Sequence, residues 1–229
     1  MASDCAGGPR PADATLAASR GCSDDVPNVP GSPWTVRLRK EASVSNTSQS
    51  RGDDACRHLL GTRLPPVSLP STDGKTVAPA RIPGRVVLYA YPRTSRPGEA
   101  PLPGWDSIPG ARGCTPQSCA FRDHYSTLRA LNVAEVYGLS TQDSAYQHEM
   151  VARLHLPFPV LSDAHLAFAT SLGLPTFTVA GHVLLRRLTL IVDDGTISCV
   201  FYPVPFPERN ADEVEAWLRQ AAPVSGARD

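Results

Sequence analysis

The chain has 229 residues, of which 41% are hydrophobic, and this is enough apolar material for an ordinary globular core. Its 22 basic and 22 acidic residues balance, so we expect neither a nucleic acid nor an anionic membrane as a partner. The longest apolar runs, such as Val86–Tyr91, are too short to cross a bilayer. The first residues contain no apolar signal core, and six cysteines are too few for a disulfide scaffold. We therefore expect a cytoplasmic protein with reduced thiols.

The composition divides the chain into three parts. Residues 1–55 are rich in Pro, Gly and Ser and show no hydrophobic period, which predicts a disordered extension. Residues 56–223 carry the periodic segments expected of a folded domain, and residues 224–229 are expected to form a flexible tail. Within the domain, residues 97–113 are so rich in Pro and Gly that we interpret them as an inserted surface loop. We expect this insertion to lean over the mouth of the site, with Trp105 packed against the domain.

The first half of the domain predicts strands and one helix. A short hairpin is expected around Asp73-Gly74. The continuous β-branched and aromatic run over Arg85–Tyr91, closed by Pro92, is typical of a buried strand. A helix is expected to follow Cys114, because apolar residues recur there at helical intervals, namely Phe121, Tyr125, Leu128 and Leu131.

The second half alternates strands and helices before it ends in a hairpin and a helix. A second central strand is expected over 134–140, a helix capped by Asp143 or Ser144, a short extended piece over 157–163 and a helix ending near Gly173. A hairpin is expected around residues 193–195, and the last helix should begin near Asn210 and bury Val214, Trp217 and Leu218. This order predicts an α/β, thioredoxin-like fold with a central mixed β-sheet flanked by helices on both faces.

Two cysteines, Cys114 and Cys119, stand five residues apart at the expected start of a helix. Zinc ligands usually pair at shorter gaps, Cys56 and Cys199 are isolated, and the histidines are scattered, so we expect no metal. The free N–H groups and the dipole at a helix N-terminus favour a thiolate on Cys114. The alternative interpretation is that both cysteines are small buried hydrophobes.

The segment GCTPQSCAFRD, residues 113–123, resembles the active-site segment of the peroxiredoxins, specifically the Q-type branch related to bacterioferritin comigratory protein. Other segments resemble the same family in the same order, namely YAYPRT, GLSTQD, PFPVLSD and RLTLIVDDGTI. The similarity runs from about Leu64 to Arg219. It implies that Cys114 is the peroxidatic cysteine, Cys119 the resolving cysteine and Arg187 the active-site arginine.

The resemblance also implies the reaction and the partners. Hydrogen peroxide and organic hydroperoxides would be reduced through a Cys sulfenic acid and an intramolecular disulfide, which thioredoxin or a similar dithiol would recycle. No cofactor is implied, and relatives of this branch are often monomeric, so we expect a monomer or a weak dimer. Two other functions of a thioredoxin-like domain stay open at this point, a redox sensor without turnover and a copper-delivery protein.

One departure from the family concerns the hydroxyl and the proline that usually precede the peroxidatic cysteine. The corresponding positions hold Ala111 and Ser107, and the Tyr-Pro element lies upstream of the insertion. Thr94 is therefore our first candidate for the catalytic hydroxyl, and Ser95 is the second. Either assignment requires the insertion to fold back toward Cys114.

Two further expectations concern geometry. Adjacent strand residues face opposite sides, so only one of Arg186 and Arg187 can enter the site, and the resemblance selects Arg187; the alternative is two surface arginines. Residues five apart in a helix have Cα atoms about 8–9 Å apart, beyond the roughly 7 Å limit for a disulfide. We therefore expect the turn between Cys114 and Cys119 to unravel on oxidation. Its Ser, Thr and Pro residues predict that this costs little.

Overall fold

The computed structural model describes residues 53–221, and its centre is a five-stranded mixed sheet. The strands are β3 (Arg85–Ala90), β4 (Val133–Ser140), β5 (Val160–Ser162), β8 (Leu188–Asp193) and β9 (Thr196–Phe201), in the spatial order β5-β4-β3-β8-β9. β3 pairs in parallel with β4 and antiparallel with β8. All six residues of β3 are buried, which explains why its sequence is a continuous apolar run instead of an alternating one.

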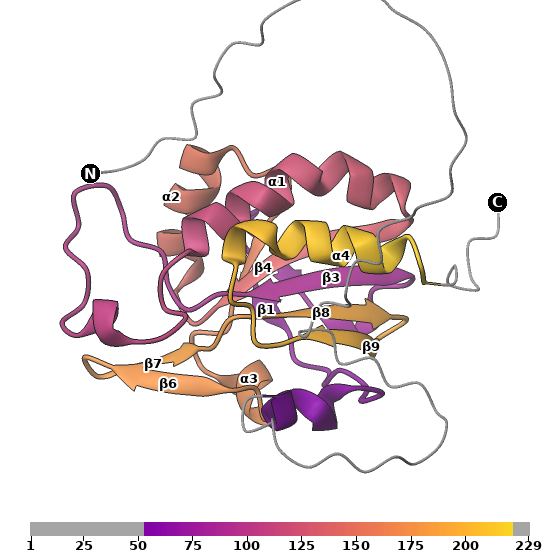
Figure 1. Cartoon of the computed structure of the whole chain (residues 1–229), viewed down its shortest axis with the longest axis horizontal. Coiled ribbons are helices and arrows are strands. Elements are labelled where there is room, and N and C mark those ends of the chain that lie inside the picture. Colours follow the sequence, from indigo (N-terminus) through magenta and orange to yellow (C-terminus); the bar gives the residue numbers. More distant parts are fainter. Residues whose placement is uncertain (1–52, 222–229) are drawn as a thin grey trace, which may run out of the picture.

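Helices cover both faces of this sheet, as the sequence predicts (Figure 1). One face carries α1 (Cys114–Ala130), α2 (Ser144–Leu154) and α4 (Asn210–Leu218), and the other carries the 3-10 helix η1 (Asp53–Leu59) and α3 (Ala167–Leu172). Successive residues of β3 serve the two cores in turn: Tyr89 packs under α1, and Leu88 belongs to the opposite cluster. The predicted thioredoxin-like α/β fold is confirmed.

Several local predictions are also confirmed. β1 (Leu69–Pro70) and β2 (Thr76–Val77) form the first hairpin, and β8 and β9 form the second. Asp143 caps α2 by accepting a hydrogen bond from the Tyr146 N–H at 2.7 Å, and Gly173 ends α3 in the left-handed conformation. In α4, Val214 and Leu218 are buried, but Trp217 remains half-buried beside the Arg85 guanidinium.

One pair of strands lies outside the prediction. β6 (Thr176–Val179) and β7 (His182–Leu185) form a separate two-stranded antiparallel hairpin. Its turn residues, Ala180 and Gly181, have φ values of 46° and 79°, which belong to a tight hairpin turn. The Ala-Gly dipeptide between two alternating segments was the available signal. Arg186 and Arg187 lie between β7 and β8, so neither arginine belongs to a strand.

The remaining segments complete the chain. The predicted extension, residues 1–55, lies outside the described residues except for its last three, which begin η1, and the predicted tail, residues 224–229, lies outside them entirely. Three further 3-10 helices occur, η2 (Pro79–Arg81), η3 (Trp105–Ser107) within the insertion, and η4 (Pro207–Arg209). Within residues 53–221, no helix is both long enough and apolar enough to cross a membrane.

Candidate active site

The thiol of Cys114 lies at the N-terminus of α1. Cys114 is the first helical residue, and it is only 4% exposed. Gly113 caps the helix with a φ of 102°, and a Cβ at this position would lie 2.6 Å from the ring of Pro207. Glycine is therefore required here for both conformation and space. The helix start places backbone N–H groups and the positive end of the helix dipole beside the sulfur.

A single arginine contacts this sulfur. The Nη2 group of Arg187 lies 3.3 Å from Cys114 Sγ, although the two residues are 73 positions apart. The same nitrogen donates to the backbone carbonyl oxygens of Arg112 at 2.9 Å and Gly110 at 3.3 Å. Arg187 is 4% exposed, so its charge acts on the sulfur with little screening by water. The structure therefore brings Cys114 and Arg187 together, as the sequence analysis expected.

A buried chain of hydrogen bonds fixes the Arg187 guanidinium beside Cys114. Its Nη1 group donates to Gln117 Oε1, and Gln117 Nε2 donates to Asn210 Oδ1 at 3.0 Å. Thr189 Oγ1 donates to the same Asn210 oxygen at 2.6 Å. Gln117, Thr189 and Asn210 are completely buried. Sequence reasoning missed this network, and its one available signal was Gln117, which follows Cys114 by three residues and so shares its helix face.

Thr94 lies in the same pocket as Cys114. A pocket of about 470 Å³ is lined by Thr94, Ser95 and Cys114, together with several residues of the insertion. Gln142 fixes Thr94, because its Oε1 accepts from the Thr94 N–H at 2.9 Å and its Nε2 donates to the Thr94 carbonyl at 2.9 Å. The insertion thus folds back and returns the chain to Cys114. Both candidate residues, Thr94 and Ser95, line this pocket, and the Thr94 hydroxyl donates to Gln142 Oε1 at 3.3 Å.

Cys119 lies in α1, in the same intact helix as Cys114. Neither cysteine forms a disulfide, and Cys119 is 6% exposed. The other two described cysteines, Cys56 and Cys199, are buried and form no disulfide. Burial raises the pKa of the Cys56 thiol to about 12, so this thiol remains protonated and unreactive near neutral pH. Among the described cysteines, Cys119 is the nearest to Cys114 along the sequence, and it lies in the same helix.

The turn between the two cysteines is held by more than its own helix bonds. Ser118 is fully buried and accepts a hydrogen bond from the Tyr89 hydroxyl at 3.2 Å. Gln117 is equally buried within the Arg187 network. These tertiary contacts would also have to break if the turn unravels, and the small cost expected from local helix propensity does not include them.

The same part of the chain offers no obvious metal centre. Among residues 53–221, no three His, Cys, Asp or Glu side chains converge as metal ligands. His148 and His155 lie on the exposed surface of the α2 region. The polar groups near Cys114 are the Arg187 guanidinium, the residues Thr94 and Ser95, and the backbone N–H groups at the start of α1.

A thiol at a helix N-terminus, beneath an arginine and beside a thioredoxin-like sheet, defines a thiol-dependent redox protein. The profile of the redoxin family matches residues 59–216. Peroxiredoxin Q from Populus jackii, described as chloroplastic, is 31% identical over 173 residues, which cover 75% of this chain and 73% of the relative. Peroxiredoxin Q from Sedum lineare, also described as chloroplastic, is 32% identical over 156 residues, covering 67% of this chain and 74% of the relative.

Solved structures agree on the fold. Peroxidoxin BcpB from Mycobacterium tuberculosis matches with a TM-score of 0.58 and 24% identity, covering 71% of this chain and 97% of that protein. Peroxiredoxin Q from Xanthomonas campestris matches with a TM-score of 0.55 and 20% identity, covering 69% and 94% of the two chains.

The chain belongs to the redoxin family and, within it, to the Q-type peroxiredoxins. Its activity is that of a thiol peroxidase, which reduces a peroxide and is returned to the reduced state by a thiol reductant. The two alternatives, a sensor without turnover and a copper-delivery protein, are not favoured.

Proposed function

We propose that Cys114 is the peroxidatic cysteine, that Cys119 resolves the oxidised form, and that Arg187 and Thr94 complete the catalytic site. The observation that carries this proposal is the 3.3 Å contact between Arg187 Nη2 and Cys114 Sγ. A charge-assisted N–H donor at this distance stabilises the thiolate and remains in place to act on an incoming peroxide.

The first chemical step consumes the peroxide. The Cys114 thiolate attacks one oxygen of the O–O bond, an S–O bond forms, and the O–O bond breaks. The sulfur loses two electrons and becomes a sulfenic acid, while the other oxygen leaves as an alkoxide or hydroxide and takes a proton. Charge develops along the O–O bond during this step, so donors aimed at the pocket stabilise the transition state more than the bound substrate.

Arg187 and Thr94 are the residues that we assign to this stabilisation. Arg187 is fixed by the carbonyl of Arg112 and by Gln117, so its guanidinium needs no reorganisation when charge develops. Thr94 lines the same pocket, Gln142 binds both its N–H and its carbonyl, and the Thr94 hydroxyl donates to Gln142 Oε1 at 3.3 Å. These contacts support Thr94 over Ser95 as the hydroxyl that contacts the peroxide.

The second step forms the disulfide. Cys119 attacks the sulfur of the Cys114 sulfenic acid, an S–S bond forms, and the oxygen leaves as water. Because both residues begin in one intact helix, the turn between them must unwind first. A dithiol reductant then reduces the disulfide and restores both thiols. We propose thioredoxin or a similar dithiol for this role, acting on a monomer, or at most a weak dimer, in the cytoplasm.

Stopped-flow peroxide consumption with thioredoxin and thioredoxin reductase tests these roles. Cys114→Ser should abolish turnover. Cys119→Ser should consume one equivalent of peroxide and then stop, because the sulfenic acid forms but no disulfide follows. Cys199→Ser, which replaces another buried cysteine, should keep turnover near the wild-type level and so serves as the matched control. Normal cycling by Cys119→Ser would exclude Cys119 as the resolving thiol.

A further inference from the structure

The insertion, residues 97–113, supplies more than half of the residues that line the pocket above Cys114. The pocket has a volume of about 470 Å³ and is open to solvent, and its lining combines polar side chains with the apolar residues Pro101, Trp105, Ala111 and Pro116. It far exceeds the space that hydrogen peroxide needs, since a molecule of similar size, water, takes about 30 Å³. Most of the pocket is therefore available to the part of a substrate that does not react.

The first attachment of the insertion is polar and joins it to α2. Glu99 accepts a hydrogen bond from the Tyr146 hydroxyl and another from the Arg96 N–H at 3.0 Å, and it pairs with Arg93 Nη2 at 3.1 Å. The Arg96 guanidinium lies 4.5 Å from the centre of the Tyr146 ring. One carboxylate thus joins the start of the insertion to α2.

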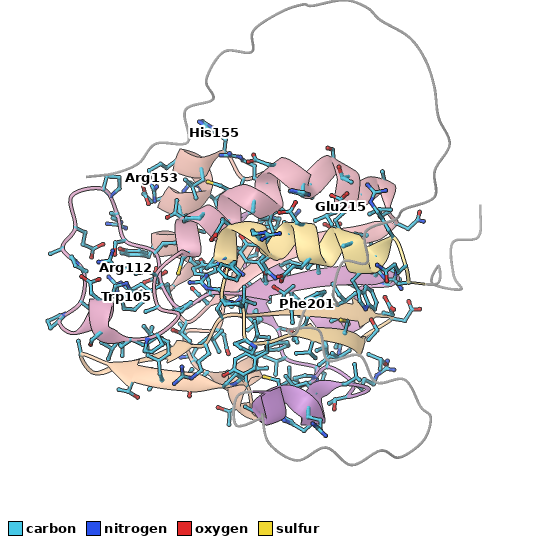
Figure 2. All side chains as sticks on the ribbon, in the orientation of Figure 1. Trp105, Arg112, Arg153, His155, Phe201 and Glu215 are labelled. Carbon is cyan, nitrogen blue, oxygen red and sulfur yellow. The ribbon has the colours of Figure 1, made fainter. Side chains whose placement is uncertain are left out.

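The second attachment is aromatic and joins the insertion to the β6–β7 hairpin. The Trp105 ring lies 6.3 Å from the ring of Phe177 in β6, at an angle of 43° between planes. The Arg186 guanidinium lies 5.5 Å from the Phe177 ring centre and supports it. Figures 1 and 2 show the insertion, with its labelled Trp105, next to this hairpin. Arg186 therefore braces the pocket wall while its neighbour Arg187 reaches Cys114.

We propose that this insertion, held by Glu99 and Trp105, is the specificity-determining wall of the site and gives the enzyme a preference for aryl or bulky alkyl hydroperoxides over hydrogen peroxide. The inference rests on the proposed function, since it assigns the substrate's non-reacting group to the pocket above Cys114. Trp105 and Pro101 supply apolar surface to the wall of this pocket. Hydrogen peroxide has no group that can contact them, so only the larger substrate gains from these residues.

The test compares cumene hydroperoxide with hydrogen peroxide in the full-length enzyme. Trp105→Ala should lower kcat/KM for cumene hydroperoxide about tenfold and leave that for hydrogen peroxide within about twofold, the scale of losing apolar contact in a specificity pocket. Tyr146→Phe keeps the ring under Arg96 but removes the hydroxyl that binds Glu99, and it should shift the ratio of the two values in the same direction by a smaller factor. Phe206→Ala is the matched control, because Phe206 is 50% exposed and does not line the pocket.

The outcomes separate this inference from the proposed function. An unchanged ratio in Trp105→Ala, with an active wild-type enzyme, would overturn the specificity role alone. An equal fall for both peroxides would also overturn it, because Trp105 would then act by shaping Cys114. A wild-type enzyme inactive toward both peroxides, or an active Cys114→Ser variant, would instead contradict the proposed function.

Discussion

Two segments meet at Cys114, and they are held in opposite ways. The start of α1, residues 114–119, is fixed by hydrogen bonds of fully buried side chains. Gln117 binds both Arg187 and Asn210, and Ser118 binds Tyr89. Residues 97–109 of the insertion are fixed by the partly exposed contacts of Glu99 and by one aromatic contact of Trp105, whereas the carbonyls of residues 110–112 bind the buried Arg187. Buried hydrogen bonds cannot be exchanged for water, whereas exposed pairs contribute only about 0–1 kcal/mol each.

The difference separates two tasks. In the proposed cycle, the buried turn sets the reacting geometry and opens when the disulfide forms, so we expect its contacts to affect both the rate of peroxide reduction and the rate of disulfide formation. The insertion can change its sequence with little effect on the core, and it is therefore suited to selecting substrates. Four predictions test this division, ordered from the largest expected effect to the smallest.

The largest effect is expected from Arg187→Lys. Lysine keeps the charge but lacks the planar fork that contacts Cys114, Gln117 and the Arg112 carbonyl together. The rate constant for Cys114 oxidation should fall by about 10²–10³, as for the loss of one fixed transition-state donor. Rapid mixing with hydrogen peroxide measures it. Arg186→Lys is the matched control and should change this constant less than threefold; equal losses in both variants would contradict the assignment of Arg187.

Asn210→Ala tests whether the buried hydrogen bonds of Asn210 restrain the turn between Cys114 and Cys119. The change leaves the Gln117 amide and the Thr189 hydroxyl without their shared acceptor, so we expect unfolding to become easier by about 1–3 kcal/mol. Peroxide reduction should slow because Arg187 is held less firmly. Disulfide formation should accelerate because the turn opens more easily, so less Cys114 sulfinic acid should accumulate at high peroxide.

Mass spectrometry of Cys114 and a thermal melt read out the two effects of Asn210→Ala. Val214→Ala, which removes a buried side chain from the same helix without touching the network, controls for general destabilisation. If both variants alter sulfinic acid formation equally at matched melting temperature, Asn210 is an ordinary structural residue and does not restrain the turn between the two cysteines.

Shortening the insertion should change selectivity more than stability. Residues 99–109 can be replaced by two glycines, whereas Gly110, Ala111 and Arg112 must stay because their backbone carbonyls surround Arg187. We expect the preference for cumene hydroperoxide to disappear while the melting temperature falls by only a few degrees, about the effect of 1 kcal/mol. A large drop in melting temperature with unaltered selectivity would show that the insertion belongs to the stable core.

The smallest effect concerns pH. The Tyr146 hydroxyl and the Arg96 N–H hold the pKa of Glu99 below its ordinary value. Because the pKa of Glu99 is lower in the folded protein, its ionised carboxylate stabilises the attached insertion at pH values above its unfolded-state pKa of about 4.3. This stabilisation is lost as the pH falls through the folded-state pKa of Glu99. The ratio of kcat/KM for cumene hydroperoxide to that for hydrogen peroxide should therefore fall between about pH 5 and 3. Taking the ratio removes the shared protonation of Cys114, and Glu99→Gln should flatten the profile.

Local patterns determined most of the secondary structure. The buried run of β3, the Asp143 cap, the Asp194-Gly195 hairpin turn and the start of α1 at Cys114 all depend on neighbouring residues, so the sequence could predict them. The order of these elements was enough to predict the mixed sheet, because parallel strands need helical crossovers and a hairpin pairs with itself. The β6–β7 hairpin has the same local character, and only its turn signal was overlooked.

Tertiary structure decided what the residues around Cys114 do. Thr94 and Cys114 share a pocket only because the insertion returns the chain, and Arg187 meets the sulfur only because β8 pairs with β3. The cost of opening the first turn depends on Asn210, which lies 93 positions from Gln117. Helix propensity follows from a residue and its near neighbours, but the burial of a hydrogen-bonded side chain follows from elements that meet only in the folded chain.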